Sequence, residues 1–268
     1  MLCEKQQEDL CKILKTPIKR PIKLDDIVKI ALTDPESEIE TTQTYKRALD
    51  CDMSDFACGF YEILYKDILK DTKKILDNKG KLINKMFAGD TMNSFNTIAN
   101  EVPDAGESKE LRTCCDKWPK YLKDYHRDYH CLANFWLIPM KLGRTLEPGS
   151  KACKKYQDYM DNFLKGIKLK WEKYYNNYSE YFSKFKDYED FLEKHFLKDV
   201  YVDESGEICG FSPHKDPEKV DDAEKVDDAE KVITNMQKMI KKRAEAISKS
   251  QYAEELWKYF VSIGILKD

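Results

Sequence analysis

The chain has 268 residues, of which 35% are charged and 41% hydrophobic, and both Gly (10) and Pro (9) are scarce. This mixture favours amphipathic helices, because a β-sandwich would need frequent turn residues. The formal net charge of −3 argues against a protein that binds nucleic acid or anionic membranes over its whole surface.

The sequence predicts a cytoplasmic protein that does not enter a membrane. Charge begins at Glu4, so the first residues lack the apolar core of a signal peptide. The longest apolar run, Leu132 to Met140, is far shorter than the roughly 20 residues of a membrane-spanning helix. The nine cysteines are an odd number scattered along the chain, which indicates reduced thiols and no disulfide framework.

Helical periodicity and capping residues predict the elements of the N-terminal part. Asp34 is a candidate N-cap followed by Pro35 at the first helical position, and Ser54 or Asp55 starts a further helix. The expected helices cover residues 2–14, 25–32, 34–49 and 54–79.

A small polar stretch follows, from Gly89 to Thr97. We expect Asp90 or Thr91 to cap a short helix there. A free helix N-terminus could hold a phosphate, but the same residues serve equally as an ordinary cap. Asn93 and Asn96, three residues apart, can present amide donors and acceptors to one ligand.

The second half of the chain continues the helical pattern. Residues 152–198 carry aromatic side chains at three- and four-residue steps, typical of a core stripe on two helices divided near Lys186. Asp187, with Asp190 three residues later, resembles a capping box. Turn residues between two short apolar runs predict a small β-hairpin near 200–211.

A short acidic repeat precedes the C-terminal helices. The sequence Glu-Lys-Val-Asp-Asp-Ala occurs twice from Glu218, and its valines, six residues apart, do not share a helix face. We therefore predict an all-α, bundle-like single domain with one small hairpin. It consists of a main helical domain over 1–214, an acidic connector over 215–231 and C-terminal helices over 232–268 that pack back on the main domain.

The strongest candidate for a site is the segment from Tyr125 to Arg144, which we expect to be helical. His126, His130 and Asn134 are spaced at four residues, so on a helix they form one stripe beside an apolar run. Polar groups in such surroundings belong either to a buried hydrogen-bond network or to a pocket.

A metal centre is the least favoured interpretation of this pair of histidines. Zinc prefers His and Cys ligands, and Cys114, Cys115 and Cys131 are near in sequence. However, the C-x-x-C element and the glutamate of H-E-x-x-H are absent. We expect neither a metal nor a cofactor.

Two resemblances bear on function. The segment Tyr125–Arg144, with Gly89–Asn96 before it and Ile240–Trp257 after it, resembles helical proteins of low-GC Gram-positive bacteria over about Thr91 to Phe260. The chain is also similar to the HEPN class of helical ribonucleases of toxin and phage-defence systems. Their signature is Arg, four to six residues, then His, whereas Arg127 and His130 have two residues between them.

Two hypotheses follow for the function. The first is a non-catalytic binding protein of a conflict system between bacteria and phage, with a protein partner or a small polar ligand. Its predicted ligand-binding residues are Asp90, Asn93, Asn96, Asn134 and Trp136.

The alternative is a metal-independent, HEPN-like endoribonuclease. In that case His126 and His130 would transfer protons and Arg144 would stabilise phosphate charge. The net negative charge of the chain makes nucleic acid the less favoured partner.

Overall fold

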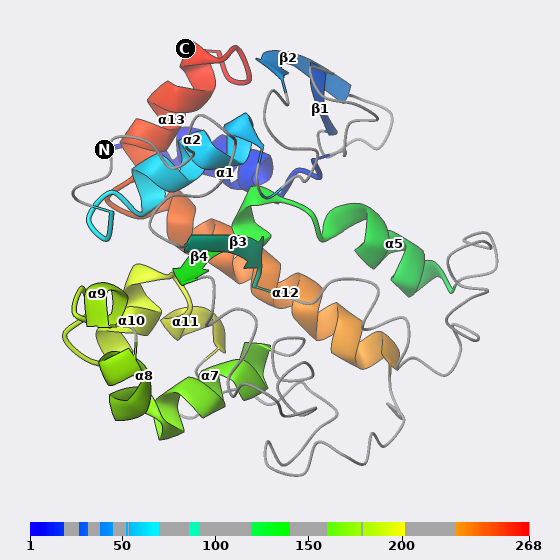
Figure 1. The fold of residues 1–268 in the computed structure, drawn as a ribbon. Helices are drawn as coiled ribbons and strands as arrows, with labels where there is room; N and C mark the ends of the chain where they lie inside the picture. Colours follow the sequence, from blue (N-terminus) through cyan, green and yellow to red (C-terminus); the bar gives the residue numbers. More distant parts are fainter. Residues whose placement is uncertain are drawn as a thin grey trace. The chain divides into compact units, whose positions relative to one another are not determined.

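The computed structural model describes residues 1–18, 27–31, 38–44, 52, 54–69, 86–91, 119–139, 160–177, 179–201 and 229–267. Helices dominate this part of the chain (Figure 1), so the predicted all-α class is confirmed. The chain forms two compact units. Unit 1 comprises Met1–Asp90, His130–Ile138 and Lys241–Asp268, and unit 2 comprises Thr91–Tyr129 and Pro139–Ile240.

Unit 1 is built from helices of both ends of the chain. In Figure 1, α13 (Ala253–Ser262) lies beside α1 (Glu4–Lys15) and α2 (Asp55–Leu64), and it contacts both. α12 (Ala229–Ser248) contributes its C-terminal part to this unit. The apolar face that the sequence predicts for α1 is buried here, with Leu10 and Leu14 fully enclosed.

The start of α2 confirms Ser54 as its cap. The Ser54 hydroxyl accepts a hydrogen bond of 3.1 Å from the Ala57 amide, which satisfies one of the free amides of the first turn. Inside the unit, the ring of Phe56 packs against Phe260 of α13 at a centroid distance of 5.9 Å. The rest of the predicted 54–79 helix, beyond residue 69, lies outside the described residues.

Two short strand pairs also belong to the structure, and the helices expected over 25–32 and 34–49 are wrong. β1 (Ile27–Ala31) pairs antiparallel with β2 (Glu38–Thr44), in a register that places Ile30 opposite Ile39. The sequences IVKIA and EIETTQT are rich in β-branched residues, which favour strands over helices. A second pair joins β3 (Met86–Asp90) and β4 (Phe135–Pro139).

Unit 2 has a core of aromatic side chains. Its described helices are α5 (Lys120–Asp128), α7 (Met160–Leu169), α8 (Trp171–Asn177), α9 (Ser179–Phe182), α10 (Tyr188–Lys194) and α11 (Lys198–Tyr201), together with the N-terminal part of α12. The ring of Trp171 meets Phe182 edge-on at 5.0 Å, and Phe191 packs on His195 at 4.6 Å. Tyr174, Phe182 and Phe185 of the predicted core stripe are buried. The prediction of two helices divided near Lys186 is wrong, because the described part of 152–198 is broken into the shorter helices α7, α8, α9 and α10 before α11 begins.

Local capping in unit 2 follows the sequence. The Asp187 carboxylate accepts a hydrogen bond of 2.9 Å from the Asp190 amide, and the Asp190 carboxylate accepts one of 2.8 Å from the Lys186 amide. Asp187 therefore caps α10, but the return hydrogen bond comes from the amide of Lys186 and not from that of Asp187, as a capping box would require.

The predicted hairpin near 200–211 does not begin where the sequence placed it. Val200 and Tyr201 are the last residues of α11, so the first expected strand is wrong at these positions. Residues 202–211 lie outside the described residues, as do residues 215–228 of the acidic connector. α12 begins at Ala229, within the range assigned to that connector.

Candidate functional site

The segment that carries the predicted site does not form one helix. α5 ends at Asp128, and the chain then turns, passes through the 3₁₀ helix η5 (Leu132–Asn134) and enters β4. The expected stripe of His126, His130 and Asn134 at helical spacing is therefore wrong. The three residues lie in a helix, a turn and a 3₁₀ helix.

The two histidines lie in different surroundings. His126 is exposed on α5 in unit 2, with its ring centroid 6.2 Å from that of Tyr129. His130 belongs to unit 1 and is half-buried, with its ring edge-on to Phe135 at 6.0 Å. Its carbonyl accepts a hydrogen bond of 2.8 Å from the Ile18 amide. A joint role of both imidazoles in catalysis stays a prediction.

The predicted ligand-binding residues do not share one environment. Asn134 and Trp136 are buried in unit 1, with exposed fractions of 0% and 3%, so a ligand could reach them only if the core opened. Asp90 is the last residue of β3. Three predicted residues lie outside the described part of the chain: Asn93, Asn96 and Arg144. The assignment of these residues to a site stays a prediction.

A buried arginine organises the turn into β4. Arg243 of α12 is fully enclosed, and its Nη1 donates hydrogen bonds to the carbonyl oxygens of Ala133 (2.6 Å) and Phe135 (2.8 Å). Its Nη2 donates to the Tyr65 hydroxyl at 3.2 Å. Burial raises the pKa of Tyr65, while Arg243 and a backbone hydrogen bond from Leu137 act in the opposite direction. One guanidinium thus satisfies oxygens of three residues in the core.

Arg243 is not among the residues predicted from the sequence, although the sequence contains a signal for it. Buried residues of α12 recur at three- and four-residue steps: Ile233, Met236, Ile240, Ala244 and Ile247. Arg243 falls on this face, three residues after Ile240. A charged residue on the apolar face of an amphipathic helix indicates a buried polar partner.

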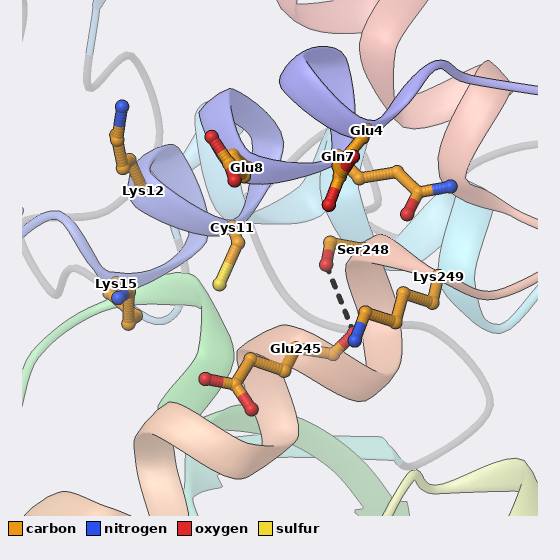
Figure 2. Close-up of a pocket in the computed structure, with 9 residues that line it drawn as sticks. All are labelled: Glu4, Gln7, Glu8, Cys11, Lys12, Lys15, Glu245, Ser248 and Lys249. Atoms are coloured by element: carbon orange, nitrogen blue, oxygen red, sulfur yellow. Dashed lines mark hydrogen bonds between the residues drawn. The ribbon is translucent and has the colours of Figure 1, made fainter.

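A groove of about 650 Å³ lies in unit 1, between α1 and the C-terminal end of α12 (Figure 2). The α1 side is formed by one helix face, since its residues recur at three- and four-residue steps. The lining residues are Glu4, Gln7, Glu8, Cys11, Lys12 and Lys15 from α1, and Glu245, Ser248 and Lys249 from the opposite side.

The walls of the groove carry charges of both signs at each end. In Figure 2, Glu4 lies towards the same end as Lys249, and Lys15 towards the same end as Glu245. The thiol of Cys11 lies between these ends (Figure 2).

Most of the charged lining residues have no ion-pair partner in the described part of the chain. Lys12 is paired with Asp9 at 3.2 Å. Among the described residues, no ion pair involves the other five: Glu4, Glu8, Lys15, Glu245 and Lys249.

The thiol in the groove is held in its protonated form. Burial raises the pKa of Cys11, and Glu245 adds to this effect, whereas Lys15, Lys241 and a hydrogen bond with Ser248 oppose it. The Ser248 hydroxyl also donates a hydrogen bond of 3.0 Å to the Glu245 carbonyl. Because the thiolate is the reactive form, this environment gives Cys11 little nucleophilic character near neutral pH.

Comparison of the chain with protein-family models, curated proteins and solved structures gives no match. None of the helices in the described ranges combines the length and the hydropathy that a bilayer crossing needs. Within the same ranges, no three His, Cys, Asp or Glu side chains are grouped so that they could hold a metal ion.

Proposed function

We propose that the protein is a non-catalytic binding protein and that the groove between α1 and α12 holds a segment of a partner protein. The observation that carries this proposal is the set of charged side chains on both walls without ion-pair partners among the described residues. Such side chains can pair with a ligand at once, whereas charges already paired within the protein would first have to separate.

The groove also has a suitable size and an open rim. A volume of about 650 Å³ lies within the range of about 300–1,000 Å³ typical of ligand sites. Glu4, Glu8 and Lys249 are exposed at its edge, so a longer chain can enter and leave it without a change of the helices.

The chemistry of the lining residues favours binding over covalent catalysis. Cys11 is protonated near neutral pH for the reasons given above. The nine lining residues, all of them described, include no histidine that could act as a base for Ser248. Charge complementarity is what these side chains offer to a ligand.

We place this binding protein in the cytoplasm. The cysteines in the described ranges are free thiols, namely Cys3, Cys11, Cys58 and Cys131. Free thiols are typical of proteins in a reducing compartment, and this supports the cytoplasmic assignment.

Site-specific photo-crosslinking tests the proposal. A photoreactive amino acid at Glu8, on the rim of the groove, should yield a defined adduct with one protein in the cells that produce this chain. The matched control is the same amino acid at Glu172, an exposed acidic residue of α8 in unit 2. The partner is then purified, and its affinity is measured for wild type, Glu8→Lys and Glu172→Lys.

We expect Glu8→Lys to weaken binding of the purified partner and Glu172→Lys to leave it unchanged. An adduct that forms equally at both positions, or equal affinity of the three proteins, would overturn the proposal. Circular dichroism of each variant checks that the helices are intact, since both substitutions are at exposed helix positions.

A further inference from the structure

We propose that the turn between α10 and α11, at residues 195–197, is an acid-sensitive switch, in which a proton taken up by His195 releases the turn from the aromatic core of unit 2. This turn lies in unit 2, whereas the proposed binding groove lies in unit 1. Three features of the turn support the switch: a buried imidazole, a strained backbone at the next residue, and the apolar side chains that follow.

The imidazole of His195 is enclosed by aromatic rings, and 0% of this residue is exposed to solvent. Its ring centroid lies 4.6 Å from that of Phe191 and 5.6 Å from that of Phe185. Its Nε2 lies 2.6 Å from the Tyr181 hydroxyl, in a hydrogen bond with α9. Because His195 is the C-cap residue of α10, this hydrogen bond ties the end of α10 to α9.

The surroundings of His195 favour its neutral form. An imidazolium would lose its hydration in the core, and the faces of the aromatic rings replace only a part of it. The Lys194 ammonium lies 5.6 Å from the centre of the Phe185 ring, which packs on His195. A second positive charge in this cluster would therefore be repelled.

The other charged groups of α10 and α11 are paired with one another. The Lys198 ammonium lies 2.6 Å from the Glu193 carboxylate and 3.7 Å from that of Glu189. Although burial acts to raise it, the pKa of Asp190 is held below its ordinary value by hydrogen bonds from the Lys194 ammonium and the Lys186 amide. Asp190 therefore stays ionised between pH 7 and pH 5, which leaves His195 to take up the proton.

The residue after His195 has a strained backbone. Phe196 has a φ of 58°, in the left-handed region that disfavours residues with a Cβ. It occupies the position that is usually glycine in a Schellman motif, in which the Leu197 amide donates a hydrogen bond of 2.8 Å to the Leu192 carbonyl. His195 and Leu197, on either side of Phe196, are fully buried and hold it in this conformation. Release of His195 would allow Phe196 to relax.

The direction of the switch follows from proton binding in the two forms. The pKa of a free histidine is about 6.5. The closed turn favours the neutral ring, whereas the ring of the released turn is hydrated and binds its proton in the ordinary way. The released form therefore gains population as pH falls below about 6.5. One proton taken up per release gives an increase of about 25-fold in the opening equilibrium from pH 7 to pH 5.

Release of the turn would also expose apolar surface. Leu197 and Val200 follow His195 directly in the chain, and both are buried in the closed form. Weak acid would therefore open this part of unit 2 without a change in unit 1.

Amide hydrogen exchange of the full chain between pH 7 and pH 5 tests the switch. The opening equilibrium is obtained from peptides of α10 and α11, after correction for the effect of pH on the intrinsic exchange rate, and peptides of α2 and α13 report on unit 1. The proteins compared are wild type, His195→Gln and Tyr181→Phe. The matched control is His126→Gln, which replaces an exposed histidine of α5 in the same unit.

We expect the 25-fold increase in α10 and α11 of wild type and of His126→Gln, with no such increase in α2 and α13. Tyr181→Phe should be more open at every pH and keep the increase, because it retains the imidazole. His195→Gln should lose the increase. The imidazole NMR signals of wild type give a second measurement without any substitution: His126 should titrate near pH 6.5, and His195 should keep the shift of its neutral form while the turn is closed.

Four outcomes would overturn the proposal. They are an increase that persists in His195→Gln, an increase that is lost in His126→Gln or Tyr181→Phe, an equal increase in α2 and α13, and a His195 signal that titrates like that of His126 while the turn is closed. If His195→Gln does not fold, the NMR titration and Tyr181→Phe decide.

Discussion

At the scale of single residues, Arg243 shows how a buried cation can stabilise a fold through neutral oxygens. Taking a charge out of water is costly unless hydrogen bonds replace its hydration. The guanidinium of Arg243 donates to two carbonyl oxygens that neighbour each other across the junction of η5 and β4, and to the Tyr65 hydroxyl of unit 1. These partners come from two parts of the sequence that are both far from Arg243, so Arg243 couples them.

Replacement of Arg243 should therefore destabilise the protein strongly. We expect Arg243→Met to lower the free energy of unfolding by about 2–4 kcal/mol, because it leaves the carbonyls of Ala133 and Phe135 without this donor in the core. Arg243→Lys should rescue little of this loss, because the ammonium group of lysine lacks the planar set of N–H donors of a guanidinium. Urea unfolding measures the free energy of unfolding of both variants. The control Lys242→Met, at an exposed neighbouring position, should change the value by less than about 0.5 kcal/mol.

Tyr252 gives a prediction about alkaline pH. Its hydroxyl donates a hydrogen bond of 2.6 Å to the Asp67 carboxylate, and burial, followed by this hydrogen bond, raises the pKa of Tyr252 to about 12. The unfolded value is about 10, so the folded protein holds this proton more tightly. The stability from this pair is complete below pH 10 and is lost as pH rises from 10 to 12.

The difference in unfolding free energy between wild type and Tyr252→Phe tests this. We expect wild type to lose its advantage over the variant progressively across that pH window, when both are unfolded with urea at each pH. A difference that stays constant from pH 9 to 12 would show that the proton of Tyr252 is not coupled to folding.

At the scale of elements, α2 and α13 approach each other closely at one glycine. A Cβ built at Gly59 would lie 2.5 Å from Cζ and 2.8 Å from Cε2 of Tyr259. The Tyr259 hydroxyl donates a hydrogen bond of 3.1 Å to the Phe56 carbonyl, which fixes the ring in this position. The absence of a side chain at Gly59 therefore allows the two helices to pack.

Gly59→Ala should destabilise the protein, even though alanine is the better helix former. We expect a loss of about 1–3 kcal/mol from the overlap with Tyr259. A double-mutant cycle with Tyr259→Ala provides the control, because removal of the ring should make Gly59→Ala neutral or stabilising. An equal cost of Gly59→Ala in both backgrounds would contradict this account.

The elements that could be predicted from the sequence are those set by local signals. Ser54 and Asp187 cap helices where their spacing indicated, and α12 and α13 lie close to the expected ranges. In these cases the hydrogen bonds that define the element join residues within a few positions of one another. Their partners can therefore be identified from a short stretch of sequence.

The elements that could not be predicted depend on distant partners. α5 ends at Asp128 without a Gly or Pro, and the His130 carbonyl after it bonds to Ile18, more than a hundred residues away. β4 likewise pairs with β3, which precedes it by about fifty positions. The groove also depends on residues that are distant in sequence, because nothing in the local sequence of α1 indicates that Glu245 lies opposite this helix.

At the scale of the whole molecule, the described residues form two cores of different character. Unit 1 combines aliphatic and aromatic side chains around Arg243, whereas unit 2 is dominated by aromatic rings around His195. In unit 2 the Tyr181 hydroxyl lies 2.6 Å from Nε2 of the fully buried His195. Each core thus contains its own buried polar group.

Hydrogen exchange should report the two cores separately. We expect Arg243→Met to increase deuterium uptake in α2, β4 and α13, and Tyr181→Phe to increase it in α8 and α10, because a buried polar group loses a partner in each case. Mass spectrometry of peptides from these helices measures the uptake. If either substitution raised uptake equally in both sets of helices, the two cores would be one cooperative unit.

The residues of unit 2 separate the helices α1 and α13 of unit 1 in the sequence, and this fixes an order of events during synthesis. The ribosome releases α1 before residues Thr91–Tyr129 and Pro139–Ile240 of unit 2, and α13 after them. Unit 1 therefore cannot complete its core until α13 has emerged, while unit 2 can form earlier. During that interval the apolar faces of α1 and α2 lack their partner helix, and the nascent chain is then most exposed to aggregation and most in need of a chaperone.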